Sequence, residues 1–388
     1  MNILKNLAKI QYKYSSLIFI VSVIFTIAIG LGIQNIHLQT DLSKELPQDL
    51  DVIKLQNMVS DKFEESDTVM ILIRLNKSCE IENSPIDIRD PRVIKMIVNL
   101  ENEIKKESSV TSIQSVASFF ISPENVPNNI ELIKKIFVNM PNSKMFFNKD
   151  YSATIMLISA DFGKSEEKID NFISKIERDI KSVEKPACVD VSITGNPSIR
   201  AVLMEILQHD MVYTMAIAAI IILLLLIVLK KSFTKGLLIF TPLMLGLTWT
   251  LGLMGWLNIP LSVATVGIGA MILGLGTEYG IFLVERYGEE RKKGKNQKRA
   301  LITALPSVGS GIIGSGTTTI VGFLALLLAS MPMIHHLGET LALGIFCILF
   351  ATIVISPSVI LIEERFIKNI EKIELKILRG GMKYEKTN

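Results

Sequence analysis

Residues 261–284 read LSVATVGIGAMILGLGTEYGIFLV and carry a single charged side chain, Glu278. Because a helix rises about 1.5 Å per residue, a stretch of this length can cross a hydrocarbon core about 30 Å thick. Five further uncharged stretches qualify as membrane spans. They are Leu17 to Ile33, Met211 to Leu229, Leu237 to Trp256, Ile312 to Ser330 and Leu341 to Ile362. The sequence therefore predicts a membrane protein with six transmembrane helices.

The composition agrees with this class of protein. Only 20% of the 388 residues are charged, against about 25% in soluble domains. The net charge of +3 is small, and the basic residues lie beside apolar blocks rather than in a patch with aromatic residues. A nucleic-acid partner is therefore not expected.

The basic residues also predict the orientation. Three Lys precede the first span, three follow the second, and seven Lys or Arg follow each of the fourth and sixth spans, whereas the short connections 258–260 and 332–340 carry none. Since positive charge stays on the cytoplasmic side, both termini are expected inside the cell membrane and the long segment 34–210 outside. A cleaved signal peptide is the alternative for the first span, but its apolar stretch is long and no small-x-small site follows.

The predicted domains follow from this order. They are 1–33 (cytoplasmic N-terminus and first helix), 34–210 (extracytoplasmic domain), 211–362 (a bundle of five helices) and 363–388 (basic cytoplasmic tail). The layout is one helix, a large domain, then five helices with short loops.

The external segment predicts an α+β domain. Apolar strands are expected at 69–75, 110–116, 154–158 and 189–193, with amphipathic helices after Asp90-Pro91 and after Glu166-Glu167. Apart from an inserted helix near 129–139, the order is β-α-β-β-α-β, that of a ferredoxin-like split unit. In that topology the end of the first strand meets the start of the fourth, where Cys79 and Cys188 lie. A disulfide between them is plausible outside the cell; two free thiols are the alternative.

Glu278 is the first candidate for chemistry. A carboxylate within a membrane helix costs several kcal/mol and is by default a functional candidate. The adjacent Tyr279 and the small residues around both suggest tight packing, which would favour the neutral carboxyl. Such a group could take a proton from one side of the membrane and release it to the other. The alternative is a solvated charge at the interface.

Neighbours in sequence point about 100° apart on a helix, so Glu278 and Tyr279 cannot pair well with each other. Across a two-fold axis, Glu278 of one chain could meet Tyr279 of a second, which predicts a homodimer. Threonines of the fifth span are the alternative partners: Thr317, Thr318 and Thr319. Close helix packing is expected at Gly274, Gly276, Gly280 and Gly314.

Other candidates are weaker. His335 and His336 are expected as a solvated pair in an outer loop, and His37 and His209 at the interface. Cys347 is expected to be a packing residue. The sequence has no phosphate loop, nucleophile elbow or zinc motif, so neither a metal nor a cofactor is expected.

The layout and motifs resemble the resistance-nodulation-division (RND) superfamily, in particular the half of an MmpL-like or hopanoid transporter. Residues 274–282, GLGTEYGIF, are similar to the G-x-G-T-D-Y-x-x-F run of that branch, with Glu278 in place of the usual aspartate. Residues 40–47, TDLSKELP, and 317–325, TTTIVGFLA, add to the resemblance. Members usually hold two such halves in one chain.

The resemblance implies a proton-driven exporter of lipids or other hydrophobic molecules, not an enzyme, with a porter-type external domain. Glu278 and Tyr279 would form the proton relay, and a homodimer would replace the two fused halves. Two alternatives remain. One is a protein-export subunit similar to SecD and SecF, and the other is a lipid-sensing receptor or scaffold without net transport.

Overall fold

A computed structural model describes residues 2–55, 58, 67–79, 81–140, 143–162 and 166–366. The chain divides into two compact units. Unit 1 comprises Met1–Pro47 and Leu207–Asn388, and unit 2 comprises Gln48–Ile206. Residues 34–47, expected in the external domain, thus group with the membrane helices. Of the predicted basic tail, residues 367–388 lie outside the described residues.

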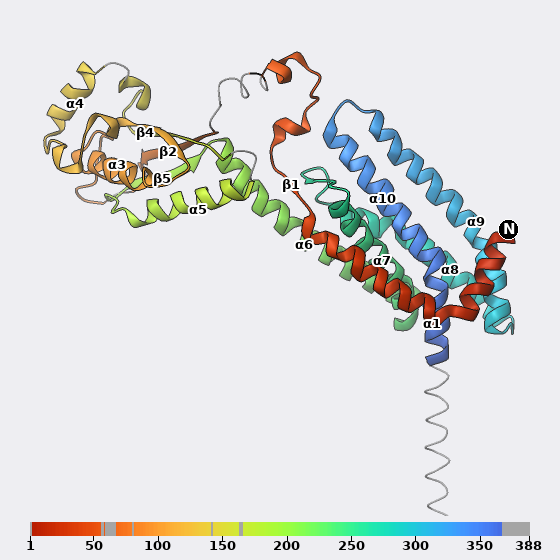
Figure 1. Ribbon diagram of the computed structural model, residues 1–388. Coiled ribbons are helices and arrows are strands. Elements are labelled where there is room, and N and C mark those ends of the chain that lie inside the picture. Colours follow the sequence, from red (N-terminus) through yellow and green to blue (C-terminus); the bar gives the residue numbers. More distant parts are fainter. Residues whose placement is uncertain are drawn as a thin grey trace, which may run out of the picture. The chain divides into compact units, whose positions relative to one another are not determined.

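Unit 1 is helical (Figure 1). Within the described residues, six helices are long and apolar enough to cross a membrane. They are α1 (Asn2–Gly30), α6 (Asn196–Lys230), α7 (Phe233–Trp256), α8 (Ile268–Lys292), α9 (Gln297–Leu324) and α10 (Pro332–Val354). Residues 196–206 of α6 belong to unit 2. The prediction of six membrane-spanning helices is confirmed, and the protein is a multi-pass membrane protein.

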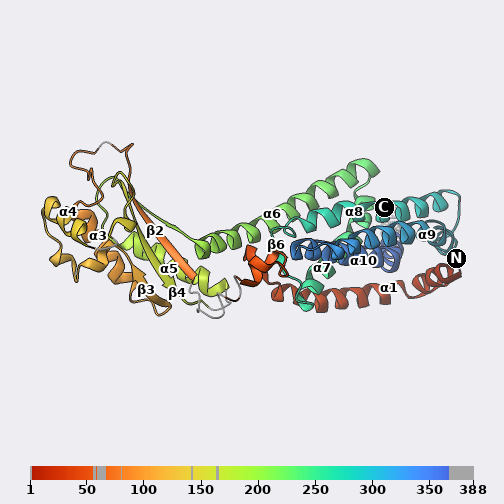
Figure 2. The ribbon, with the colours of Figure 1, turned by 90° about the horizontal axis from the view of Figure 1, so that it is seen from above.

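The helices of unit 1 are unequally buried. α7 contacts α1, α8 and α10, while α9 contacts α1, α8 and α10. The apolar windows of α7, α8 and α10 are half or more buried, whereas those of α1, α6 and α9 are almost wholly uncovered. Figure 2 shows α7, α8 and α10 running alongside one another. Much of the apolar surface of unit 1 is therefore free to meet lipid or another protein.

Two details of unit 1 differ from the expectations. The fourth predicted span begins with Leu261–Ser262, which form the short strand β6, and helix α8 begins only at Ile268. β6 pairs in parallel with β1 (Leu38–Gln39), which lies just after α1. His335 and His336 lie in the first turns of α10 rather than in a loop, because Pro332 at the first helical position starts the helix early.

Unit 2 contains a four-stranded antiparallel sheet. Its strands are β2 (Asp67–Leu75), β3 (Val110–Gln114), β4 (Ala153–Ala160) and β5 (Val189–Thr194), in the order β3-β4-β2-β5. Leu75 at the end of β2 lies opposite Val189 at the start of β5. β2 and β5, the first and the last of these four strands along the chain, are thus neighbours in the sheet.

Two helices cover one face of this sheet. α3 (Pro91–Ile104) follows β2 and α5 (Glu166–Ser182) follows β4, and the two contact each other. Val69, Ile71 and Ile73 alternate along β2 and are fully buried beneath them, as the period of two in a strand requires. The inserted helix α4 (Ile130–Asn139) lies within the expected range, and the side chain of Asn129 caps its start by accepting a hydrogen bond from the Glu131 amide.

Candidate functional site

The two residues of the predicted relay lie in different environments. Tyr279 is 1% exposed and belongs to the apolar core of unit 1. Glu278 is exposed in the single chain. Within the described residues of a single chain, Glu278 is therefore not enclosed by neighbouring helices. The physical reason is the helical angle of about 100° between successive residues: when Tyr279 points into the bundle, Glu278 points away from it.

Ser315 of α9 lies near both side chains. Its Oγ lies 3.5 Å from Glu278 Oε1, which is longer than an ordinary O–H···O hydrogen bond. The hydroxyl of Tyr279 lies near the side chains of Thr319 and Ser315. The sequence analysis did not identify Ser315, although it lies one turn before Thr319 and therefore on the same face of α9.

The three predicted threonines have different roles. Thr318 and Thr319 donate hydrogen bonds to the carbonyl of Ser315, at 2.8 and 2.9 Å. Thr319 also lies near Tyr279, while Thr317 and Thr318 are exposed. Only Thr319 of the three thus lies against the predicted relay in the single chain.

The predicted glycines also fall into two groups. A Cβ atom on Gly276 would approach Ile348 of α10 to 2.6 Å, and one on Gly280 would approach Ile239 of α7 to 3.0 Å. Gly274 and Gly314 have nothing within 4 Å of such an atom, so the expected tight packing at these two positions is not found within one chain. The reason is their position on the uncovered sides of α8 and α9.

Glu278 belongs to an uncovered stripe of α8. Met271, Leu275 and Phe282 on the same face are 51%, 41% and 51% exposed. On α9 the neighbouring exposed positions are small residues: Gly311, Gly314, Ser315 and Thr318. We call these residues of α8 and α9, together with Gly274 and Glu278, the Glu278 surface. A polar group on an apolar, small-residue membrane surface indicates a place where another helix can approach closely.

Cys79 and Cys188 lie just beyond the paired ends of β2 and β5. Their sulfur atoms are bonded in the structure and their Cα atoms are 5.5 Å apart. The amide of Asn76 donates to the carbonyl of Cys188, which brings the two connections together. Cys347 is a buried free thiol of α10, as expected of a packing residue.

The described residues hold no group of three or more potential metal ligands. His209 Nδ1 lies 3.2 Å from Asp210, and its ring stacks on Tyr213. His336, by contrast, lies 25% exposed beside the buried carboxylate of Glu45, with 3.7 Å between Nδ1 and Oε2.

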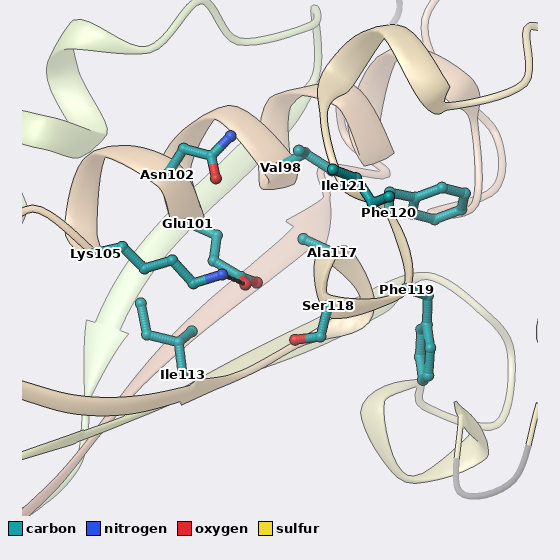
Figure 3. Close-up of a pocket in the computed structure, with 10 residues that line it drawn as sticks. All are labelled: Val98, Glu101, Asn102, Lys105, Ile113, Ala117, Ser118, Phe119, Phe120 and Ile121. Atoms are coloured by element: carbon teal, nitrogen blue, oxygen red, sulfur yellow. Dashed lines mark ion pairs between the residues drawn. The ribbon is translucent and has the colours of Figure 1, made fainter.

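A cavity of about 370 Å³ in unit 2 contains a second buried carboxylate, which the sequence analysis did not identify. Figure 3 shows Glu101 of α3 and Lys105, the residue after that helix, pointing toward each other, with Phe119 and Phe120 on the other side of the cavity. Glu101 is paired with Lys105 at 2.7 Å and accepts a hydrogen bond from Ser115. Both carboxylate oxygens thus have partners, so Glu101 connects α3 to the segment after β3.

The six spanning helices and the acid-tyrosine pair of α8 define a polytopic membrane protein of the RND type. The sequence profile of the MMPL family matches residues 50–375. The chain therefore belongs to the MMPL family.

The chain is similar to three named relatives over different lengths. Protein MJ1562 of Methanocaldococcus jannaschii is 36% identical over 95% of this chain and 96% of its own length. The siderophore exporter MmpL5 of Mycobacterium tuberculosis is 24% identical over 61% of this chain. The sulfolipid-1 exporter MmpL8 of the same species is 26% identical over 25% of this chain. The alignments span 25% and 9% of the lengths of these two exporters.

Proposed function

We propose that this protein exports lipids or other hydrophobic or amphiphilic molecules across the cell membrane, driven by proton influx, and that it works as a homodimer. Membership of the MMPL family and the similarity to a siderophore exporter and a sulfolipid exporter support export of this class of molecule. The observation that carries the mechanism is the placement of Glu278 on an uncovered membrane surface, with Tyr279 and Ser315 directly behind it.

A second copy would complete this site. If two Glu278 surfaces faced each other, each carboxyl would leave contact with lipid and come within reach of the partner chain's hydroxyl groups. Gly274 and Gly314 would then supply the close approach that they do not supply within one chain. A carboxyl enclosed in this way can bind and release a proton with a change of local packing, which couples proton movement to conformational change.

The proposal includes an orientation of the chain in the membrane. Unit 2, with its β-α-β-β-α-β order, would be the ferredoxin-like, porter-type domain outside the membrane, and both termini would be cytoplasmic. An apolar groove of about 570 Å³ on unit 1, lined by Leu257, Ile320, Leu324, Phe346 and the single carboxylate of Glu339 among others, offers space for the chain of a hydrophobic molecule.

The test uses purified protein in vesicles with an imposed proton gradient and fluorescent phospholipid and fatty-acid probes. We expect Glu278→Gln to lose gradient-driven movement of the transported probe by about 100-fold, since the amide cannot bind and release the proton. Glu285→Gln is the matched control, because Glu285 lies on the same helix, exposed, and pairs with Lys230. Full gradient-driven transport by Glu278→Gln would refute the relay.

The same assay separates the alternatives. A lipid-sensing receptor or scaffold would bind the probe without moving it, whatever the gradient. A protein-export subunit would co-purify with a translocation channel and leave the lipid probes in place. Two mycobacterial relatives are a siderophore exporter and a sulfolipid-1 exporter, which favours the export of small hydrophobic molecules over the two alternatives.

A further inference from the structure

A second buried acid of interest, Glu45, lies in the segment 40–47 of unit 1, far along the chain from Glu278. Glu45 ends the short 3-10 helix η2 (Leu42–Glu45), which follows α1 and β1. Its side chain is only 5% exposed, and its Oε2 atom lies 3.7 Å from Nδ1 of His336 on α10. Both residues belong to unit 1.

The polar side-chain atoms of Glu45 and His336 lack hydrogen-bond partners. Glu45 Oε1, Glu45 Oε2 and His336 Nδ1 are all buried, and none has a hydrogen-bond partner among the described residues. A distance of 3.7 Å is too long for a hydrogen bond but short for an electrostatic contact. A buried carboxylate without a hydrogen-bond partner costs free energy. A proton on Glu45 or on His336 would lower that cost.

The neighbouring charged residues do not compensate the charge of the Glu45 carboxylate. On η2, Asp41 and Lys44 pair with each other at 3.8 Å. On α10, His335 contacts the carbonyl of Ala329 through its Nε2 atom, and Glu339 lies one turn further along, in the apolar groove. Among the described residues, no Lys or Arg pairs with Glu45. His336 is thus the cation available to it.

We propose that Glu45 and His336 form a second proton-binding site, which holds one proton between them at the end of unit 1 where α1 ends and α10 begins. With the proton on His336, the contact becomes an ion pair; with the proton on Glu45, the carboxyl is neutral; without it, the buried carboxylate is uncompensated. Burial raises the pKa of the Glu45 carboxyl above its ordinary value, and the nearby His336 opposes this more weakly.

The site is separate from the Glu278 surface. β1 and β6 mark the same end of unit 1, since Leu38 pairs with Leu261 shortly before α8 begins. Glu278 lies ten residues into α8, about 15 Å from its start at 1.5 Å per residue. Proton occupancy at Glu45 and His336 would set how firmly η2 is held to α10. The chain enters unit 2 at Gln48, only three residues beyond Glu45, so the first connection to unit 2 would respond to pH.

The test is a histidine titration by NMR on the full-length protein in nanodiscs. The chain has only four His, so ring-labelled protein gives four signals, each assigned by one His→Gln variant. We expect Glu45→Gln to lower the titration midpoint of His336 by about one pH unit or more, because removal of a carboxylate at this distance removes the stabilisation of the imidazolium. The signals of His37, His209 and His335 report whether the variant remains folded.

Glu339→Gln is the matched comparison, because it neutralises an acid on the same helix three residues from His336. An unchanged His336 midpoint in a folded Glu45→Gln protein would overturn the proposal, and so would an equal shift in Glu339→Gln, since that would indicate a general field rather than a pair. A role of this site in transport rests on the proposed function, but its titration does not. If Glu278→Gln transported normally while the His336 shift appeared, only the relay would fail.

Discussion

At the scale of single residues, Glu278 and Tyr279 are adjacent in the chain but lie in different environments. Tyr279 fills the core of unit 1, while Glu278 lies on its outside. The glycines show the same contrast, since Gly276 and Gly280 face neighbouring helices and Gly274 does not. Whether a small residue in a membrane helix serves packing within the chain or leaves a surface for a partner depends on the direction in which it points.

Gly252 of α7 provides a test of packing by a small residue. A Cβ atom there would overlap the backbone carbonyl oxygen of Ile29 on α1, and backbone cannot rotate away as a side chain can. We expect Gly252→Ala to destabilise the protein by about 1–3 kcal/mol and to lower the midpoint of thermal unfolding in detergent. Gly322→Ala on α9, where nothing lies within 4 Å, should leave that midpoint unchanged or raise it. Equal effects of the two changes would contradict the role of Gly252.

At the scale of elements, the edge of the sheet in unit 2 depends on β5. This strand pairs only with β2 among the described strands, and the bond between Cys79 and Cys188 lies beside that pairing. Because the bridge closes a loop across 109 positions of the sequence, it restricts the unfolded chain strongly.

We therefore expect the double variant Cys79→Ser with Cys188→Ser to lose about 2–4 kcal/mol of stability in unit 2. The measurement is denaturant unfolding followed through hydrogen exchange of the β2 and β5 amides. Thiol counting supplies the check on the bridge itself: denatured but unreduced wild-type protein should expose one reactive thiol, that of Cys347, and reduced protein three. Three thiols before reduction would show that no bridge forms.

At the scale of the whole molecule, the single chain leaves three of its membrane helices largely uncovered. Lipid can cover apolar side chains, but a carboxylate among glycines and hydroxyl groups is a poor lipid-facing surface. A second copy related by a two-fold axis would bury the same surface on both chains. This is the physical argument for a dimer.

Cross-linking tests the dimer directly. In a Cys347→Ala background, we expect Thr318→Cys, on the Glu278 surface, to form an intermolecular disulfide under mild oxidation in membranes. Ile20→Cys on α1, which is 54% exposed but lies outside that surface, should remain monomeric. A dimer band of equal strength from both variants, or from neither, would argue against pairing through the Glu278 surface.

Much of this architecture can be inferred from local patterns. Uncharged runs such as 341–362 predict membrane helices because lipid offers no partners to an open backbone, and the short apolar run 69–75 predicts a buried strand. Only the structure shows that Val69, Ile71 and Ile73 occupy its fully buried face. Pro332 and Asn129 are local signals of helix starts that the sequence analysis did not use, and it placed residues 332–340 in a loop. For such features the period and composition of a short segment are sufficient.

Other features depend on contacts between distant segments. Leu261 and Ser262 lie in an apolar run, yet they form a strand because β1 lies beside them. Ser315 joins the candidate relay, and Glu45 meets His336, across 37 and 291 positions of the sequence. The amino-acid order thus determines which segments enter the membrane and that α8 carries an acid there. Only the packing of the helices decides that Tyr279 faces inward and Glu278 outward, because the direction of a side chain has meaning only once a neighbouring helix is in place.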